Sequence, residues 1–452
     1  MAFVRFVIKT IRLSIVRIGA GWMFALLTFN FNRVSISDLG AIAVIVTSLI
    51  GLHHFISFFG VYWGRFSDRT PILGYRRTPY VLLSSLIASL LFLLLPSVAI
   101  GLGAHSPLAT IEAIVLIVIF GISMSMNGSS SNALIAEVTT SKERGAVVAV
   151  VWAAIIISGI GSAIVAGAIM PSYDPAKMQQ LYNLTPWVVM ITALVGVLGL
   201  ERRIGKEEQA ALLAAMPDNE GDSPLSTFRV AASLMRGNVQ VRAFFLYMLL
   251  AIMGVFLQDA ILEPFGAEVF KMNQAATAHF QQAWGVGALL GMFGIGILSS
   301  LLPISKKTIA TIGGLGIAGG LAMVAISAVI FRQSLIEPGL MLMGLGIGLF
   351  NVGSLSMMME MTVEGQAGLY MGLWAMAQGL GNGLANVLSG ALHTVLIESH
   401  LLSAPAAYTA IFSFEALVMV SAVGILRGIS VQEFKGLSTK DIGAVLAMDT
   451  VG

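Results

Sequence analysis

Acidic and basic side chains concentrate in one short polar segment, where they can form a salt-bridge network. Asp68 lies between two arginines in the run Gly64-Arg65-Phe66-Ser67-Asp68-Arg69. A second glycine and two adjacent basic residues follow this run: Gly74, Arg76 and Arg77. A carboxylate in such a loop can pair with arginines or cap the positive N-terminus of a helix. We expect Asp68 to cap a helix that begins near residue 366 and the arginines to pair with acids or lipid phosphates; a solvated basic loop is the alternative.

Two further carboxylates, Asp259 and Glu263, stand four residues apart just before Pro264. This spacing places them on one face of a helix. They can bind a proton or a cation, or they can form salt bridges. Arg33, which follows Asn32, ends another apolar segment at an equivalent point. Because buried charges need partners, we expect Arg33 to pair with these acids and to lock this end of the protein.

Twelve apolar stretches must position these residues. Hydrophobic residues make up 57% of the chain and charged residues 11%, against about 25% charged residues in a soluble domain. A helix of about 20 apolar residues crosses the hydrocarbon core of a bilayer. We therefore predict an all-α membrane protein with twelve transmembrane helices. The spans are expected at 16–32, 40–62, 78–101, 109–135, 145–170, 182–200, 243–262, 276–300, 307–331, 336–358, 366–394 and 405–428.

The basic residues indicate how these spans are oriented. With twelve spans, all but four of the 25 Lys and Arg residues fall on one side, which the positive-inside rule makes the cytoplasmic side. Both termini are therefore predicted to be cytoplasmic. The basic stretch 1–17 shows no signal-peptide cleavage site and is a candidate for lying in the membrane interface. The net charge of +2 reflects this topology, and we expect no nucleic-acid partner.

The chain divides into two similar halves. We predict an N-terminal six-helix half at 1–200, a cytoplasmic linker at 201–242, a C-terminal six-helix half at 243–430 and a cytoplasmic tail at 431–452. The sequence around Glu137 and Trp152 recurs around Glu360 and Trp374, and Arg76-Arg77-Thr78 recurs as Lys306-Lys307-Thr308. Two parallel six-helix repeats are the architecture of the major facilitator superfamily.

The loop at 64–77 resembles the signature of that superfamily, a motif of the cytoplasmic gate. Glu137 and Glu360 resemble members of its cytoplasmic charge network. Arg69 and Arg144 are the partners that we expect for Glu137. This motif predicts fold and gating, and it carries no information about the substrate.

Three segments resemble a narrower group, the PucC-type or bacteriochlorophyll-delivery family of this superfamily. Asn30-Phe31-Asn32-Arg33-Val34 is similar to its Leu/Phe-Asn-Arg-Val element, and the loop from Ser67 to Tyr80 is similar to its elongated loop. The segment from Gln258 to Gly266 resembles its Gln-Asp-x-x-Leu-Glu-Pro-Tyr-Gly motif, with Phe265 in place of the tyrosine. The resemblance covers essentially the whole chain.

The resemblance implies a membrane assembly factor or carrier that handles chlorophyll or bacteriochlorophyll during biogenesis of light-harvesting or photosystem complexes. Its implied partners are membrane lipid, light-harvesting or photosystem polypeptides and chlorophyll synthase. The implied location is a photosynthetic membrane, either thylakoid or cytoplasmic. The form of the loop at 64–69 is more similar to the oxygenic, chlorophyll-using branch. The sequence makes no prediction of oligomeric state.

A pigment of this kind needs an axial ligand for Mg²⁺, flat apolar walls and space for a long tail. His53 and His54 lie inside the second span, and neutral imidazole can be such a ligand. Adjacent helical positions point about 100° apart, so we expect at most one of them to face a pigment; hydrogen bonding to neighbouring helices is the alternative. The remaining histidines are expected to be solvated or interfacial: His105, His279, His393 and His400.

Neutral polar residues mark spans four and eleven. Gln378, Asn382 and Asn386 follow an i, i+4, i+8 stripe on one helix face, and Asn132 lies in span four. These side chains either line a cavity or pack against span two. Mid-span charges are few, which argues against a hydrophilic substrate.

Several classes of protein are excluded by missing signals. The chain has no cysteine, no phosphate-binding GxxxxGK[ST] loop and no HExxH motif. We therefore predict that it is not an enzyme and binds no free metal ion. Two alternatives to the assembly factor stay open. One is a proton-coupled secondary transporter of a small apolar or amphiphilic solute, and the other is a cargo-free assembly scaffold.

Overall fold

Lipid offers no hydrogen-bond partner to backbone N–H and C=O groups, so the apolar stretches satisfy these groups within helices. The computed structural model describes residues 2–56, 60–205, 207–209, 235–301, 304–361 and 367–434. In these ranges the regular structure is helical, apart from one β-bridge between Ile72 and Tyr75.

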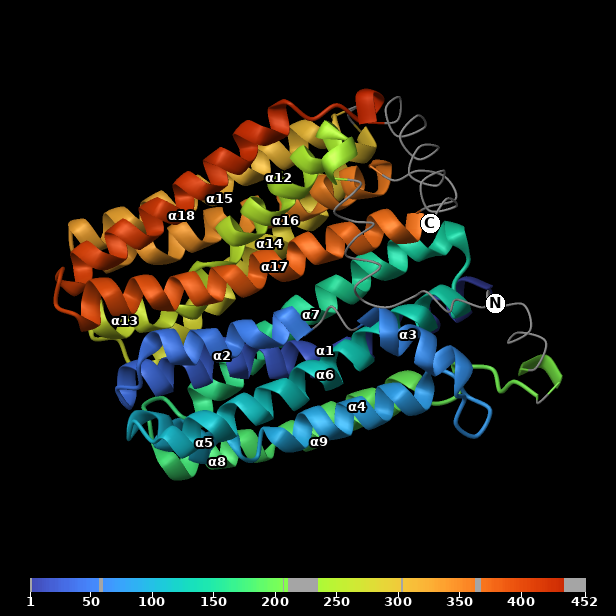
Figure 1. Ribbon diagram of the computed structural model, residues 1–452, viewed down its shortest axis with the longest axis horizontal. Coiled ribbons are helices and arrows are strands. Elements are labelled where there is room, and N and C mark those ends of the chain that lie inside the picture. The colour runs from blue at the N-terminus through green and yellow to red at the C-terminus, as the bar shows by residue number, and fades with distance from the viewer. Residues whose placement is uncertain are drawn as a thin grey trace.

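Helices of the N-terminal half and of the C-terminal half form two bundles that lie side by side (Figure 1). The N-terminal bundle contains α1 (Ala2–Ala25), π-helices η1 (Leu26–Phe31) and η2 (Val34–Asp38), α2 (Ala43–Ile56), α3 (Gly60–Arg69), α4 (Thr78–Leu91), α5 (Leu95–Gly103), α6 (Pro107–Val138), α7 (Ser141–Ile169), α8 (Pro175–Asn183) and α9 (Thr185–Val197). The C-terminal bundle contains α12 (Val239–Phe256), the 3₁₀-helix η4 (Gln258–Ala260), α13 (Leu262–Phe270), α14 (Gln274–Leu301), α15 (Lys306–Val329), the 3₁₀-helix η5 (Gln333–Leu335), α16 (Ile336–Glu360), α17 (Ala367–His393), the π-helix η6 (Thr394–Glu398) and α18 (Ala404–Arg427).

The predicted spans agree with these helices. Eleven helical segments of the described chain are long and apolar enough to cross a membrane. The remaining predicted span, 40–62, corresponds to α2 and α3, which flank residues 57–59; those three residues lie outside the described part of the chain. The fold class is therefore confirmed as an all-α, multi-pass membrane protein.

The first helix begins before the predicted span. The basic stretch at 2–17 is helical and runs directly into that span, because α1, η1 and η2 follow one another with hardly a break as far as Asp38; its place in the membrane interface stays a prediction. Some of its basic side chains reach the ends of neighbouring helices. Lys9 Nζ donates to the carbonyl of Val138 at 2.9 Å, and Arg12 Nε donates to the carbonyl of Val195 at 3.2 Å. Cations are favoured at such C-terminal helix ends.

Each half has its own apolar core. One cluster of buried side chains is built almost wholly from α12 to α18, and two others come from α1 to α9. The halves meet where α2 packs on α17 and α7 packs on α14. Glycines let helices pack closely inside the C-terminal half. For example, a Cβ added to Gly346 would lie 2.5 Å from the backbone nitrogen of Ile317.

The bundle has two ends, which carry different elements. The start of α1, the end of α18 and the loop between α3 and α4 lie at one end, called the inner end; η2 and α13 lie at the other, called the outer end (Figure 1). The cytoplasmic location of the inner end stays a prediction. Most of the predicted linker and tail, at 206, 210–234 and 435–452, lies outside the described residues.

Candidate functional site

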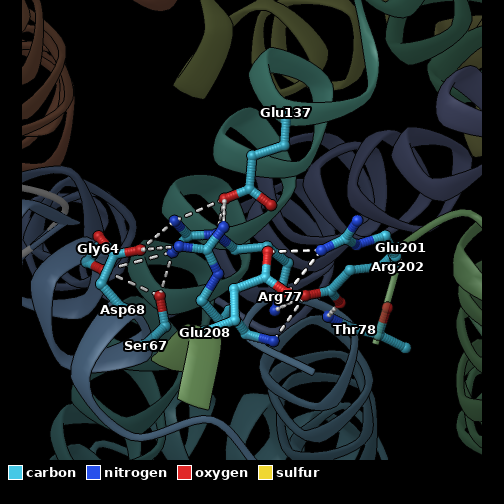
Figure 2. Close-up of polar contacts among 10 residues, drawn as sticks. Gly64, Ser67, Asp68, Arg77, Thr78, Glu137, Glu201, Arg202 and Glu208 are labelled. Atoms are coloured by element: carbon cyan, nitrogen blue, oxygen red, sulfur yellow. Dashed lines mark hydrogen bonds and ion pairs between the residues drawn. The ribbon is translucent and has the colours of Figure 1, made fainter. Parts of the chain in front are cut away.

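Arg77 is the centre of an ion-pair network at the inner end of the N-terminal half (Figure 2). Its guanidinium contacts the carboxylates of Asp68 and Glu137, the latter at 2.9 Å, and donates to the Ser67 hydroxyl at 2.5 Å. Arg76 lies 3.2 Å from Glu137 and 3.7 Å from Asp68. Arg77 is 5% exposed, so its buried guanidinium depends on these charge-assisted hydrogen bonds. The side chains of Asp68 and Glu137 are 27% and 28% exposed.

Glu201 joins this network, although the sequence analysis did not identify it. Its carboxylate accepts hydrogen bonds from the backbone N–H groups of Arg76, Arg77 and Thr78 at 2.5, 2.9 and 2.7 Å. These amides begin α4, where the N-cap residue Arg77 supplies no side-chain cap. Glu201 therefore caps α4 and ties the end of span six to the start of span three. An acid directly after an apolar span was the available signal.

The partners of Glu137 and Asp68 differ from those expected. Glu137 pairs with Arg76 and Arg77 rather than with Arg69, because α4 packs on α6 and brings the two arginines to the end of α6. The side chain of Arg144 lies outside the described set. Asp68 is engaged by Arg76 and Arg77. Residues 362–366, before α17, are not described, so the cap of that helix stays a prediction.

Within the described residues, the C-terminal half has an ion pair at the corresponding place. Lys306 Nζ contacts the carboxylate of Glu360; these two residues correspond in the repeat to Arg76 and Glu137, and their pairing was not predicted. Lys307 Nζ donates to the carbonyl oxygens of Arg427 and Ile429 at 2.6 and 2.9 Å. The start of span nine is thereby tied to the end of span twelve.

At the outer end, Arg33 does not pair with Asp259 or Glu263. Its guanidinium contacts the Asp38 carboxylate at 3.1 Å and donates to the Met272 carbonyl at 3.0 Å. Asp38 lies five residues along the same helix, so it reaches Arg33 before any acid of the other half. Glu263 instead accepts the hydroxyl of Thr277 at 3.1 Å. Arg33 still joins the halves, but through a backbone carbonyl.

Asp259 and Glu263 also do not share one helix face. Span seven breaks between them: α12 ends at Phe256, Asp259 lies in η4 and Glu263 lies in α13. The cause is Pro264, whose ring excludes a helical hydrogen bond to the carbonyl four residues earlier. That carbonyl belongs to Ala260, and it accepts instead from the side-chain amide of Asn32, across the two halves.

Further polar contacts close the outer end. The Glu398 carboxylate accepts from the backbone N–H of Ala43 at 2.8 Å, the Thr394 hydroxyl accepts from the N–H of Val44 at 3.1 Å, and the Ser37 hydroxyl donates to Glu268 at 3.4 Å. Every hydrogen bond between a described residue of one half and a described residue of the other lies at this end. The contact between the two halves, called the seam, is therefore closed at its outer end in the described part of the chain.

His393 is not solvated, contrary to expectation. It is 2% exposed, and its ring lies 3.1 Å from Glu268 and 3.5 Å from Glu398. The Tyr408 hydroxyl donates to Glu268 at 3.0 Å. His393, Glu268 and Glu398 border a cavity of about 340 Å³, which His105 and apolar residues of the N-terminal half also line. The burial follows from the seam, since the opposite half covers the helix end that carries His393.

His53 and His54 turn toward each other rather than apart. Their ring centroids are 3.9 Å apart, and the His53 ring lies edge-on to Phe120 at 5.5 Å. His53 is 8% exposed, and its Nδ1 contacts the carbonyl of Ile50 in its own helix. In the described part of the chain, no three His, Asp or Glu side chains are grouped to hold a metal ion.

The polar stripe of α17 packs on α2. A Cβ added to Gly51 would lie 3.1 Å from the Cβ of Asn386, which is 3% exposed. Asn386 Nδ2 donates to the carbonyl of Asn382, and Gln378 Nε2 lies 3.5 Å from the sulfur of Met358. Asn132 accepts from Arg17. Of the two predicted roles for the stripe, packing against span two fits Asn386.

A fully buried acid, Glu415, was missed. It is 0% exposed in the middle of α18, and one carboxylate oxygen accepts the backbone N–H of Gln258 at 2.9 Å. A single acid in an apolar span of 24 residues was a sufficient signal, because an ionisable residue inside the membrane is costly and usually functional.

Comparison with known proteins places this chain among a group of relatives. Residues 30–434 match the family model described as PUCC protein. A Rhodobacter capsulatus protein named "Bacteriochlorophyll synthase 44.5 kDa chain" is 28% identical over 93% of this chain and 95% of that protein. A Rhodovulum sulfidophilum protein named "Protein PucC" is 26% identical over 84% of each chain.

A solved structure supports the architecture. The nucleoside transporter NupG aligns with a TM-score of 0.66 over 93% of this chain and 99% of that chain, at 14% sequence identity. At that identity the likeness shows the fold alone. The major facilitator superfamily fold predicted from the repeat is therefore confirmed.

Proposed function

Because the chain belongs to the PUCC protein family, we propose that it is a membrane assembly factor or carrier for chlorophyll or bacteriochlorophyll. It would serve biogenesis of light-harvesting or photosystem complexes in a photosynthetic membrane. The observation that carries the proposal is the family match over residues 30–434. The relative named after bacteriochlorophyll synthesis supports the choice of pigment class. The oxygenic branch stays a prediction.

The exposed aromatic surface of α3 is the place that we propose for a pigment in this conformation. The rings of Tyr62 and Phe66 stack 5.9 Å apart, and the side chains are 54% and 37% exposed. A flat macrocycle can stack on such rings. By contrast, a cavity between the halves, lined in part by Phe29 and Glu263, has room for about one water molecule. The larger cavity between the halves, of about 340 Å³ at the outer end, includes the ionisable side chains of Glu268, His393 and Glu398 in its wall, which suit an apolar macrocycle poorly. The aromatic surface therefore supports binding at the outside of the bundle rather than between the halves.

Release would follow contact with a nascent antenna or photosystem helix. A polypeptide that arrives through the bilayer meets a surface pigment directly, so no passage across the membrane is needed. Light-harvesting or photosystem polypeptides are thus the proposed partners, and chlorophyll synthase is the proposed donor of the pigment.

The test is an absorption spectrum of the tagged full-length protein, purified from its native photosynthetic membrane in mild detergent, with the co-purifying polypeptides identified. We expect stoichiometric pigment, reduced by Tyr62→Leu and Phe66→Leu. His53→Leu and His54→Leu test axial ligation in α2, and His400→Asn is the matched control, since Asn tolerates the left-handed backbone of that residue (φ 58°). Partner polypeptides without pigment would contradict a carrier and favour the cargo-free scaffold.

A proton-coupled secondary transporter is the second candidate. It is favoured by the seam, whose described inter-half hydrogen bonds gather at the outer end, as expected of one state of an alternating-access protein. Reconstituted protein that accumulates a small amphiphilic solute in response to a proton gradient, and that purifies without pigment, would support it.

We propose no catalytic role, in spite of the word synthase in the name of one relative. The purified protein is expected to form no pigment from pigment precursors. Product formed in proportion to the amount of protein would overturn this part of the proposal.

A further inference from the structure

Buried oxygen atoms without a hydrogen-bond donor surround the break in span seven. The side-chain oxygens Gln258 Oε1, Asn32 Oδ1 and Glu415 Oε2 are buried and have no hydrogen-bond partner. The three residues are between 0% and 1% exposed. Unpaired buried acceptors are rare in proteins, and each needs an explanation such as a bound ion.

Contacts of the same residues place these oxygens around one turn, η4. Gln258 belongs to η4, and its backbone N–H donates to Glu415 at 2.9 Å. Asn32 donates through Nδ2 to the carbonyl of Ala260, the last residue of η4. Asp259, 4% exposed, lies between them in the turn and accepts from the side chain of Gln258.

The orientation of both amides follows from these bonds. Asn32 Nδ2 faces a carbonyl oxygen, and Gln258 Nε2 faces the carboxylate of Asp259 and the carbonyl of Val255. A flipped amide would place oxygen against oxygen. The ends of these two amides that remain without a partner are therefore the oxygens, so both amides offer acceptors at η4.

The electrostatics of this turn favour a positive occupant. Asp259 and Glu415 are buried carboxylates, and neither forms an ion pair within the described chain. Arg33, next to Asn32 in sequence, is held by Asp38 and the Met272 carbonyl. The C-terminal end of α12 adds partial negative charge. Burying such carboxylates without compensation is strongly unfavourable.

We propose that Asp259, Glu415, Gln258 and Asn32 bind one dehydrated monovalent cation of sodium size through side-chain oxygens. Calcium takes six to eight oxygen ligands, and magnesium keeps several waters, whereas this turn offers a few protein oxygens in a tightly packed interior. A proton on one of the two carboxylates completes the charge balance. Broken transmembrane helices that expose carbonyls and helix ends are suited to such ions.

The site lies across the two halves, which gives the cation a mechanical role. Asn32 comes from the N-terminal half, and the other three ligands come from the C-terminal half. A bound cation would therefore hold the outer seam closed, and its release would weaken that seam. This inference stands apart from the pigment proposal, because it needs no assumption about cargo.

The experiment measures thermal unfolding of the purified full-length protein in detergent at pH 8, in choline chloride and in NaCl at equal ionic strength. We expect NaCl to raise Tm saturably, with KCl less effective. Glu415→Gln and Asp259→Asn should abolish the shift. The exposed Glu337 of the same half provides the control, Glu337→Gln, which should keep it.

Two further measurements do not require the variants of Asp259 and Glu415 to fold. Asn32→Ala removes a single neutral ligand and should weaken the apparent Na⁺ affinity at least tenfold. Equilibrium binding of ²²Na⁺ to the unmodified protein should saturate near one ion per chain. The proposal is overturned if Tm is the same in sodium and choline, if it depends on pH alone, or if only Ca²⁺ or Mg²⁺ shifts it.

Discussion

At the inner end, each half links the end of its last span to the start of its third span. The side chain that makes this link is an acid in the N-terminal half and a base in the C-terminal half. In the N-terminal half, the carboxylate of Glu201, after span six, binds the amides that begin span three. In the C-terminal half, the ammonium of Lys307, at the start of span nine, binds the carbonyls that end span twelve. Either end of a helix can be satisfied by a charge of the appropriate sign. The repeat thus retains the contact between the elements while the chemistry of the contact differs.

The repeated tryptophans show a second difference. Trp374 is 0% exposed, and its indole N–H donates to the carbonyl of Met361 at 3.2 Å. Trp152, its counterpart, is 51% exposed on α7. Matching sequence positions in the two halves therefore do not imply matching burial. The C-terminal half uses its tryptophan as core, while the N-terminal half presents it at the surface.

The largest expected effect comes from substitution of the two tryptophans. Trp374→Ala should lower the free energy of unfolding by about 3–5 kcal/mol, since it leaves a large cavity in the core. Trp152→Ala should lower it by less than about 1 kcal/mol, because a surface side chain leaves no cavity. Unfolding by SDS in mixed micelles, followed by circular dichroism, measures both. Equal losses would show that the difference in burial has no energetic meaning.

Removal of Arg77 should come next. Arg77→Leu leaves the carboxylates of Asp68 and Glu137 without their most buried partner and should cost about 3 kcal/mol. Arg77→Lys keeps the charge but loses the planar fork, so it should cost less. The same SDS titration measures both variants. A loss for Arg77→Leu as small as for a surface residue would mean that Arg76 alone holds the network.

The cap on α4 should contribute a smaller amount. Glu201→Ala removes the acceptor of three backbone N–H groups and should cost about 1–2 kcal/mol. Lys307→Met, which removes the corresponding contact in the other half, should cost about 1 kcal/mol. Hydrogen exchange of the first turn of α4 should rise in the first variant alone. Faster exchange of the first turn of α4 in both variants would show that the Glu201 and Lys307 contacts are not independent.

The smallest effect is expected at the exposed pair. Lys306→Leu removes the salt bridge to Glu360, whose side chains are 46% and 39% exposed, and should change stability by less than about 1 kcal/mol. Added salt should erase the difference from the unmodified protein. If the loss matched that of Arg77→Leu at high salt, the two inner networks would be equivalent after all.

Much of the fold was predictable because the signals are local. Apolar length predicts the spans, and the recurrence of Glu137 and Arg76-Arg77-Thr78 as Glu360 and Lys306-Lys307-Thr308 predicts two similar halves. Local signals also existed for two features that were missed: Pro264 forbids a helical bond to Ala260, and Glu415 is an acid in an apolar span. Both indicate the break in span seven and the buried acid beside it without any knowledge of the partners.

The partners themselves were beyond the sequence. Arg33 had acids available in two halves of the chain, and its choice of Asp38 depends on distances that exist only after folding. His393 stands near a helix end, where exposure is the ordinary expectation, and it is buried because the other half covers it. The sequence by itself determined a polytopic helical protein of two similar halves with charged inner ends, since bilayer length and charge asymmetry act on local segments. Only the tertiary structure decided which charges meet and which end of the seam is closed, because those depend on how the two bundles dock.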